Sequence, residues 1–232
     1  MSIQEKYNEI LKRKDEAAIR SGRRPEDVIL MAVTKTHPAS ELNEVIDAGA
    51  TDIGENKVQE VLEKYEDVKP VRWHLIGHLQ TNKVKSIIDK VVMIHSVDSL
   101  HLAREIDKRA AAAGLKMDIL IQINSAMEET KTGIPAAELK PLVREIAETC
   151  DNLRICGIMC IPPMALAPED NRPYFREAKE LFDEMKTWGF PEEKVRPETL
   201  SMGMSGDFEV AIEEGATIVR VGSSIFGPRN YR

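Results

Sequence analysis

The chain alternates short runs of β-branched and other apolar residues with longer amphipathic segments along nearly its whole length. This rhythm is typical of βαβ units, in which helices connect the strands of a parallel sheet. It limits the fold to α/β architectures, either a closed barrel or an open sheet with helices on both faces. The predicted strands cover residues 28–35, 52–55, 72–77, 91–97, 118–124, 153–161, 199–204 and 217–222.

Helical patterns lie between these strands, and several end at a glycine, which readily takes the left-handed conformation of a helix C-terminus. A further helix is predicted at residues 2–21, before the first strand. Too few residues follow the last strand for another helix of ordinary length, so we expect the N-terminal helix to cover that side. The other predicted helices cover residues 39–48, 56–66, 82–90, 99–113, 135–149, 172–188 and 207–214.

Eight strands with intervening helices predict a closed (β/α)8 barrel of the TIM type, with residues 1–232 forming one domain. The rival is an open, doubly wound sheet. Such sheets often bind dinucleotides through a glycine-rich turn after the first strand. Here Lys35 is followed by Thr36-His37-Pro38, with no glycine for close approach to a pyrophosphate. The barrel is therefore the preferred prediction.

The composition indicates a soluble, cytoplasmic protein. The formal net charge is −7 and charges of both signs are interspersed, which disfavours a broad nucleic-acid surface. No apolar run reaches the roughly 20 residues that span a bilayer, and the polar N-terminus has no signal-peptide core. Cys150, Cys156 and Cys160 form no C-x-x-C pair, so reduced, buried thiols are favoured over a disulfide or a zinc site.

Lys35 is the first candidate for chemistry. Active sites of such barrels lie at the C-terminal ends of the strands, and Lys35 ends the first predicted strand after an apolar run at 29–33. A lysine at a barrel mouth can lose hydration, which lowers the pKa of its amine and favours Schiff-base chemistry. The alternative is a lysine that simply reaches solvent from a strand end.

Arg220 lies in the last predicted strand, on the same face as Ile218 and Gly222. In a closed barrel this strand pairs with the first, so Arg220 and Lys35 come from neighbouring strands and can point into the same mouth. A buried arginine needs a partner. Two interpretations remain: an ion pair with a barrel glutamate, or a donor to a ligand such as a pyridine nitrogen.

Two loops that contain glycine and serine follow the seventh and eighth predicted strands. The first contains Ser201, Ser205 and Asp207, and the second runs from Gly222 to Ser224. Barrels of this class often hold phosphate with these two loops, through backbone N–H groups and hydroxyls. Each loop alone would be an ordinary turn, but the pair indicates an anion site.

Asn56 and two histidines follow or occupy the second and third strands. Asn56 either faces a ligand or acts as the N-cap of the next helix. His74 and His78 lie four residues apart, on one face of a strand, but no third metal ligand is evident. Because zinc sites usually have at least about three protein ligands, we interpret both histidines as packed side chains.

Motifs spread over nearly the whole chain resemble those of the pyridoxal phosphate homeostasis protein family, which has the barrel of the alanine racemase N-terminal domain. The matching segments are residues 32–35 (Ala-Val-Thr-Lys), 54–56 (Gly-Glu-Asn), 73–83, 157–163, 201–207 and 220–227. They occur in the family's order and several are long, so the resemblance is specific.

The resemblance implies a role for nine residues. Lys35 would form the internal aldimine with pyridoxal 5′-phosphate, Arg220 would face the pyridine nitrogen, and Asn56 would lie near the ring. His78 and Met202 are carried over as further cofactor-binding positions. The residues implied around the phosphate are Ser201, Ser205, Gly222 and Ser223.

One loop departs from the family's pattern. Residues 124–133 end in the familial Lys131-Thr132-Gly133, but the residues before them are less usual. The departure concerns what this loop contacts. It does not affect the cofactor site that the resemblance implies.

The resemblance implies a carrier or buffer of the cofactor, acting on amino-acid and keto-acid balance without established turnover. Racemisation needs an acid/base on each face of the cofactor adduct, and alanine racemases take one from a second domain that this chain has no residues to form. Arginine cannot give a proton to the pyridine nitrogen, which leaves the ring a poorer electron sink. We expect a monomer without catalytic residues, with pyridoxal phosphate and PLP-dependent apo-enzymes as its partners, and no membrane partner.

Two other functions stay open. The chain could be an enzyme, either a small PLP-dependent amino-acid racemase or a Schiff-base aldolase that uses Lys35 on a phosphosugar. It could also be a structural or partner-binding protein in which Lys35 is incidental. Racemisation of alanine or serine at ordinary enzyme rates would favour the first of these, and a Lys35→Ala variant with an unchanged spectrum would favour the second.

Overall fold

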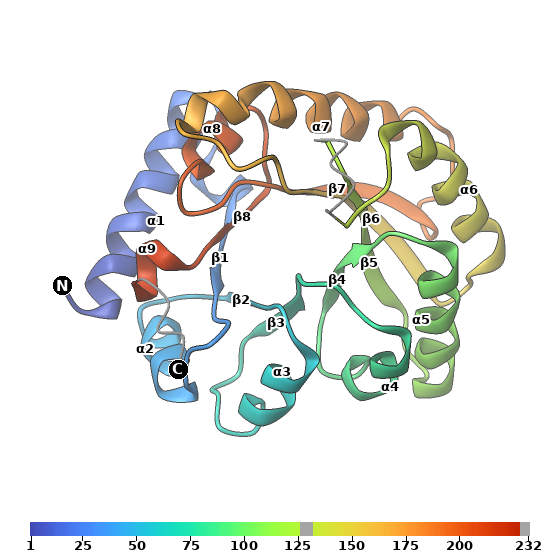
Figure 1. Cartoon of the computed structure of the whole chain (residues 1–232), viewed down its shortest axis with the longest axis horizontal. Helices are drawn as coiled ribbons and strands as arrows, with labels where there is room; N and C mark the ends of the chain where they lie inside the picture. Colours follow the sequence, from blue (N-terminus) through green and yellow to red (C-terminus); the bar gives the residue numbers. More distant parts are fainter. Residues whose placement is uncertain (126–131, 228–232) are drawn as a thin grey trace.

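Eight parallel strands form a closed barrel in the computed structural model, which describes residues 1–125 and 132–227 (Figure 1). The strands follow one another around the barrel in chain order, and β8 pairs with β1 to close it. The predicted closed barrel is therefore confirmed. The strands are β1 (Ile29–Val33), β2 (Asp52–Glu55), β3 (Arg72–Leu75), β4 (Met93–Val97), β5 (Met117–Ile123), β6 (Leu153–Cys160), β7 (Val195–Ser201) and β8 (Ile218–Val221).

The strands lie at the predicted places, with differences at their ends. β1 ends at Val33 rather than at residue 35, because the N–H of His37 donates to the carbonyl of Thr34 and turns the chain. β7 begins at Val195, earlier than predicted, because Val195 already pairs with Ile155 of β6. Most of the loop at 124–133 lies outside the described residues.

Helices form an outer ring around the strands (Figure 1). They are α1 (Ile3–Arg20), α2 (Ala39–Asp47), α3 (Val58–Lys64), α4 (Val84–Ile87), α5 (Leu100–Ala113), α6 (Leu139–Thr149), α7 (Arg172–Met185), α8 (Phe208–Glu213) and α9 (Ser223–Phe226). The helix predicted at 82–90 is shorter than expected: a 3-10 turn at Thr81–Lys83 precedes the four-residue α4. Neither has a side-chain N-cap, and so few residues gain few hydrogen bonds.

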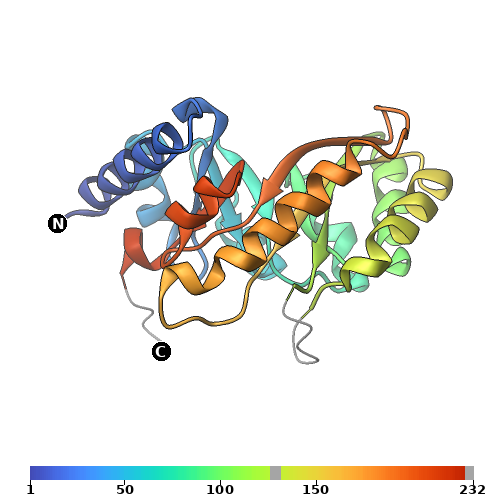
Figure 2. The same ribbon diagram turned by 90° about the horizontal axis from the view of Figure 1, so that it is seen from above.

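α1 covers the side of the barrel where, in the described residues, β8 is followed by the four-residue α9 (Figure 2). The helix begins with a capping box: Ser2 Oγ accepts from the Glu5 N–H, and the Glu5 carboxylate accepts from the Ser2 N–H. It buries Tyr7 and Ile10 and packs against α2, α8 and α9. The predicted cover by an N-terminal helix is confirmed.

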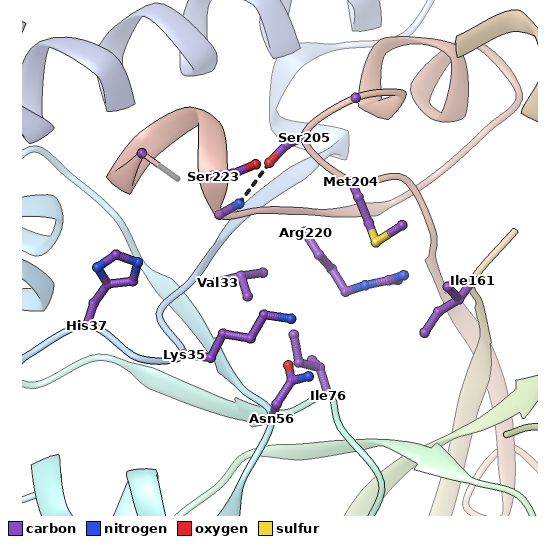
Figure 3. A pocket seen from close by; sticks show the side chains of 13 residues that line it. Val33, Lys35, His37, Asn56, Ile76, Ile161, Met204, Ser205, Arg220 and Ser223 are labelled. Carbon is purple, nitrogen blue, oxygen red and sulfur yellow. Dashed lines mark hydrogen bonds between the residues drawn. The ribbon is translucent and has the colours of Figure 1, made fainter. Parts of the chain in front are cut away.

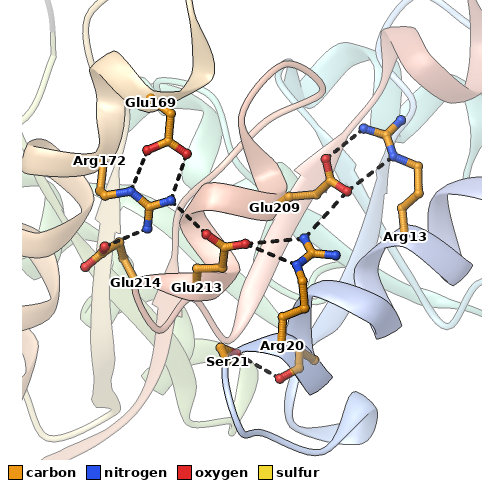
Figure 4. Close-up of polar contacts among 9 residues, drawn as sticks. Arg13, Arg20, Ser21, Glu169, Arg172, Glu209, Glu213 and Glu214 are labelled. Carbon is orange, nitrogen blue, oxygen red and sulfur yellow. Dashed lines mark hydrogen bonds and ion pairs between the residues drawn. The ribbon is translucent and has the colours of Figure 1, made fainter.

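Ion pairs join α1 to α8 around this packing (Figure 4). Arg13 Nη2 lies 2.9 Å from Glu209 Oε2, and Arg20 Nη2 lies 3.3 Å from Glu213 Oε1. Arg172, at the start of α7, also contacts Glu213, at 2.7 Å. Single pairs this exposed are worth about 0–1 kcal/mol each, so the apolar packing of α1 contributes more to its position than these pairs do.

The barrel interior holds two separate apolar clusters, because strand alternation directs every second side chain away from the helices. The first interior cluster consists of Met31, Val33, Ile76 and Ile218, on the β8–β1 side and after β3. The second interior cluster consists of Met93, Leu120, Cys156 and Met159, on β4, β5 and β6. A larger cluster fills the layer between strands and helices.

The three cysteines are buried and none is paired, as predicted. Burial raises the pKa of Cys156 to about 12 and that of Cys160 to about 11, so both thiols stay protonated at neutral pH. Within residues 1–125 and 132–227, no helix is long and apolar enough to cross a membrane.

Candidate functional site

A pocket of about 240 Å³ opens at the C-terminal ends of the strands, next to the closure between β8 and β1. The side chains of Lys35, Asn56 and Arg220 extend into the same space from three different strands or strand ends (Figure 3). The lining residues are Val33, Lys35, His37, Asn56, Ile76, Ile161, Met204, Ser205, Gly206, Arg220, Gly222, Ser223 and Gly227. The pocket thus combines an amine, a guanidinium and two hydroxyls with apolar walls.

Lys35 lies in a tight turn directly after β1. The N–H of Thr34 donates to the Gly54 carbonyl at 3.0 Å, which continues the pairing with β2, and the His37 N–H then donates back to the Thr34 carbonyl at 3.1 Å. Between them, Thr36 has φ of 69°, a left-handed conformation that β-branched residues rarely adopt. The backbone on either side of Lys35 is therefore held in a strained but defined shape.

An ion cluster of Lys64, Glu55 and Glu60 supports this turn; Lys64 and Glu55 are buried and Glu60 is half-buried. Lys64 Nζ lies 2.8 Å from Glu55 Oε1 and 3.0 Å from Glu60 Oε2, and it also donates to the Thr34 carbonyl at 3.2 Å. Glu60 Oε2 in turn accepts a 2.5 Å hydrogen bond from the N–H of Thr36. Lys64 and Glu60 therefore hold the residues immediately before and after Lys35.

The pKa values of the two carboxylates in this cluster shift in opposite directions. Burial raises the pKa of Glu55, with Lys64 opposing it, and Glu55 Oε2 has no hydrogen-bond partner among the described residues. Burial also acts to raise the pKa of Glu60, but the hydrogen bonds from Thr36 and Lys64 outweigh it and lower that pKa. Glu60 is thus the anion that holds the strained Thr36 N–H.

Arg220 lies inside the barrel, where β8 pairs with β1 and Arg220 stands next to Met31. Its side chain is 4% exposed, Nη1 donates to Ser201 Oγ at 2.8 Å, and Nη2 donates to the Cys160 carbonyl at 2.9 Å. No carboxylate of the described residues lies within ion-pair distance, so the barrel-glutamate interpretation finds no support. Burial lowers the pKa of Arg220 to about 10, so it still carries its charge at neutral pH.

The two loops predicted to form an anion site meet at the pocket. Ser205 Oγ, in the loop after β7, accepts from the N–H groups of Gly222 at 3.2 Å and Ser224 at 3.4 Å, after β8. A Cβ at position 222 would lie 3.1 Å from the Val33 carbonyl oxygen, so glycine there lets the loop lie close against β1. Ser223 adds a second hydroxyl to the same wall.

Asn56 reaches the pocket from the end of β2, and its position depends on a close backbone contact. A Cβ on Gly77 would lie 2.2 Å from the Asn56 carbonyl oxygen, so only glycine at 77 permits this approach. The N-cap of α3 is Lys57, not Asn56. The structure therefore favours the ligand-facing interpretation of Asn56 over the capping one.

Six of the nine residues expected at a cofactor site line the pocket: Lys35, Asn56, Ser205, Arg220, Gly222 and Ser223. Ser201 is buried and reaches the pocket indirectly, through its hydrogen bond from Arg220.

The structure does not bring His78 and Met202 to the pocket. His78 is exposed, and Met202 is fully buried in the layer between strands and helices. The Met202 N–H still pairs with the Ile218 carbonyl, as in a strand, and the chain turns at Gly203, which has φ of 88°. That turn presents Met204 to the pocket instead.

Residues that the sequence did not single out also line the pocket, above all His37 and Met204. The His37 ring stacks on Phe226 with a centroid distance of 4.5 Å, and its Nδ1 lies 2.7 Å from Glu41 Oε2. The position of His37 two residues after Lys35, in the same turn, was the available signal. In the part of the chain that the structure describes, no group of three or more His, Cys, Asp or Glu side chains could hold a metal ion.

The family model of the alanine racemase N-terminal domain matches residues 17–230. The pyridoxal phosphate homeostasis protein of Aquifex aeolicus is 46% identical over 233 residues, which cover 100% of both chains. The chain belongs to the pyridoxal phosphate homeostasis protein family.

Solved structures agree with this membership. A protein from Bifidobacterium adolescentis, described as unknown, superposes with a TM-score of 0.90 at 36% identity, covering 97% of this chain and 94% of that one. PipY of Synechococcus elongatus, solved with PLP bound, superposes with a TM-score of 0.79 at 34% identity, covering 94% of this chain and 100% of PipY. The barrel of this pyridoxal phosphate homeostasis family member is thus that of its solved relatives.

Proposed function

We propose that this protein binds pyridoxal 5′-phosphate in the pocket, carries it covalently on Lys35 Nζ, and acts in cofactor homeostasis without turnover of its own. The observation that carries the proposal is that Lys35 and the buried, cationic Arg220 line one pocket, together with the Ser205 and Ser223 hydroxyls. Membership of the homeostasis family, and a relative solved with PLP bound, support it.

The pocket residues fit the chemistry of each part of the cofactor. Lys35 supplies a primary amine for the aldehyde, and the hydroxyls of Ser205 and Ser223 with the Gly222 turn supply donors for the phosphate. Arg220 has five N–H donors, of which two bond to Ser201 and Cys160, so donors remain for the pyridine nitrogen.

The proposal of a carrier rather than an enzyme rests on where proton-transfer groups lie. When bound, the cofactor supplies a ring that can withdraw electrons from an attached amino acid, and a protonated pyridine nitrogen strengthens this effect. Arg220 is a poor proton source for that nitrogen. Racemisation also needs acid/base groups on opposite faces, whereas Lys35 and His37 belong to one turn.

The attachment is tested by the absorption spectrum of the purified protein before and after borohydride, followed by peptide mass mapping. We expect a visible band that bleaches on reduction and a pyridoxyl adduct on the Lys35 peptide. Lys35→Ala should lose both, while Lys57→Ala, which removes an exposed lysine nearby, should keep them. No band in the wild-type protein after adding pyridoxal phosphate would overturn the proposal.

The carrier role is tested separately, by adding the loaded protein to the apo form of a PLP-dependent transaminase. We expect the transaminase to regain activity while the loaded protein loses its visible band. The loaded protein itself should not change the optical rotation of alanine or serine. Racemisation at ordinary enzyme rates would replace the carrier by a small racemase, and release of product from a phosphosugar would replace it by an aldolase. We expect a monomer in light scattering.

A further inference from the structure

A continuous chain of side-chain hydrogen bonds runs through the barrel interior and ends at Arg220. Asp52 Oδ1 lies 2.8 Å from His74 Nε2, and His74 Nδ1 lies 3.0 Å from His95 Nε2. His95 Nδ1 lies 3.1 Å from Ser201 Oγ, which accepts from Arg220 Nη1 at 2.8 Å. All five side chains are buried, and only the last of them lines the pocket.

This hydrogen-bond chain crosses the barrel interior from one side to the opposite side. His74 and His95 lie on β3 and β4, whereas Ser201 and Arg220 lie on β7 and β8, on the far side of the closed strand order. The first and second interior clusters share no members and occupy different strands. The hydrogen-bond chain therefore spans the barrel interior, and none of its members belongs to either apolar cluster.

The two ends of the chain determine its direction. A guanidinium can only donate hydrogen bonds, and an ionised carboxylate can only accept them. Burial acts to raise the pKa of Asp52, but the hydrogen bonds from His74 and Thr51 outweigh it and lower that pKa, so Asp52 is ionised at neutral pH. Every neutral link between the two ends must then accept on the Arg220 side and donate on the Asp52 side.

This rule assigns each proton in the chain. The Ser201 hydroxyl accepts from Arg220 and donates to His95 Nδ1, so His95 carries its proton on Nε2 and donates to His74 Nδ1. His74 likewise carries its proton on Nε2 and donates to Asp52. Burial lowers the pKa of both imidazoles, that of His95 strongly, which keeps both rings neutral.

We propose that His74, His95 and Ser201 are positioning residues that fix the Arg220 guanidinium toward the cofactor ring, by joining it through a one-way hydrogen-bond chain to the distant charge of Asp52. This inference rests on the proposed role of Arg220 beside the pyridine nitrogen. It explains how the buried guanidinium is oriented without a contacting carboxylate: the hydrogen-bond chain ends at Asp52, which also lies 3.5 Å from Arg72 Nε. Because Asp52 is not in contact with Arg220, it does not compete with a ligand for the guanidinium donors.

The direction of the chain is tested on the wild-type protein without cofactor, by nitrogen-15 NMR of the histidine side chains at neutral pH. We expect both buried imidazoles to be neutral and to carry their proton on Nε2. A proton on Nδ1 of His95 would reverse the link to Ser201 and overturn the proposal. This measurement needs neither cofactor nor variant, so it stands whether or not pyridoxal phosphate binds.

The positioning role is tested with Ser201→Ala, which removes one link without touching the pocket wall. Cofactor should still attach to Lys35, but with about tenfold weaker affinity, as expected for one lost hydrogen bond to a charged group, and His95 should lose its single proton position. Thr217→Val is the matched control, because it removes a hydroxyl that accepts from Leu200 N–H between the same two strands, outside the chain. Its affinity and histidine spectrum should match the wild type.

The outcomes separate the two proposals. Equal cofactor affinity in Ser201→Ala and in Thr217→Val would overturn the positioning role, even with the expected proton positions. Absence of any Lys35 adduct in the wild-type protein would instead overturn the proposed function. A tenfold loss that appears in Ser201→Ala alone, with the adduct still on Lys35, supports both.

Discussion

The ion cluster that supports the Lys35 turn and the hydrogen-bond chain that ends at Arg220 differ in how far apart their charged groups lie. In the cluster, Lys64 contacts Glu55 and Glu60 directly, and the outcome is a fixed backbone on both sides of Lys35. In the chain, the charges of Asp52 and Arg220 are separated by three neutral links. The direct ion pairs hold the backbone around Lys35 in a strained conformation. The chain of neutral groups instead orients the Arg220 side chain and leaves its other N–H donors available.

The largest expected effect comes from Lys64→Met. It removes the cation between the buried Glu55 and the half-buried Glu60, and breaking the buried Lys64–Glu55 pair costs about 3–5 kcal/mol of unfolding free energy. Lys69→Met is the control, because Lys69 pairs with Asp47 on the surface and both side chains are about half exposed. Denaturant unfolding of the apo proteins compares them. A loss no larger than that of the control would mean that the cluster does not hold the Lys35 turn.

Arg220→Met should destabilise the apo protein less than Lys64→Met does. The Ser201 hydroxyl and the Cys160 carbonyl each lose a donor, which together costs about 1–3 kcal/mol, and no contacting carboxylate is left unpaired. Cofactor retention should fall far more than stability. Thermal melts of apo protein and a dialysis assay of the loaded protein separate the two effects. A stability loss equal to that of Lys64→Met would contradict the difference between relayed and direct charges.

The buried His95 of the hydrogen-bond chain also predicts how the free energy of unfolding depends on pH. Because the pKa of His95 is lowered well below 6.5 in the folded protein, the unfolded chain takes up a proton that the folded one refuses. Above pH 6.5 this difference in proton uptake does not affect stability. Below pH 6.5 it lowers the free energy of unfolding, by about 1.4 kcal/mol per pH unit.

Removing the imidazole should remove its share of that slope. His95→Asn should lower the acid sensitivity of unfolding between pH 6.5 and 5, although its stability at pH 7 is lower than that of the wild type. His101→Asn, which replaces an exposed histidine of α5, should leave the slope unchanged. Equal slopes for the two variants would show that burial does not keep His95 neutral in the folded protein.

The smallest expected effect lies at the strained turn. Thr36→Asn should raise unfolding free energy by about 0.5–1 kcal/mol, because asparagine tolerates the left-handed conformation better than a β-branched residue does. Thr36→Val keeps the branched Cβ and should stay within about 0.5 kcal/mol of the wild type. A loss of stability in Thr36→Asn would mean that the cluster, and not local strain, dominates the turn.

The barrel, and the positions of Lys35 and Arg220 in the candidate site, were predictable from local sequence patterns. Apolar runs and alternation identified the strands, and closure of the sheet then placed Lys35, which directly follows β1, near Arg220 on β8. Ser205 and Gly222 followed from the loops after the last two strands. These inferences succeed because strand periodicity and barrel closure are properties of short segments and of chain order.

The supporting groups were beyond such patterns. In the sequence Glu60 and Lys64 look like an ordinary exposed pair on a helix, and the contact of α3 with β2, which brings Lys64 to Glu55, is not visible there. His95 lies 106 residues from Ser201 in sequence, so no local spacing relates them. Met202 and Met204 could not be distinguished, because the turn at Gly203 decides which of them faces the pocket.

The pairing of β1 with β8, and of α1 with α8, brings the first and last parts of the chain together. Contacts between residues so distant in sequence form slowly, because closing a long loop of the chain costs conformational entropy. Pulse-labelled hydrogen exchange during refolding should therefore find the β1–β8 amides protected last. Lys35 and Arg220 lie on either side of this pairing, so the pocket is complete only once β8 has paired with β1, and we expect the ability to hold the cofactor to appear together with β1–β8 protection.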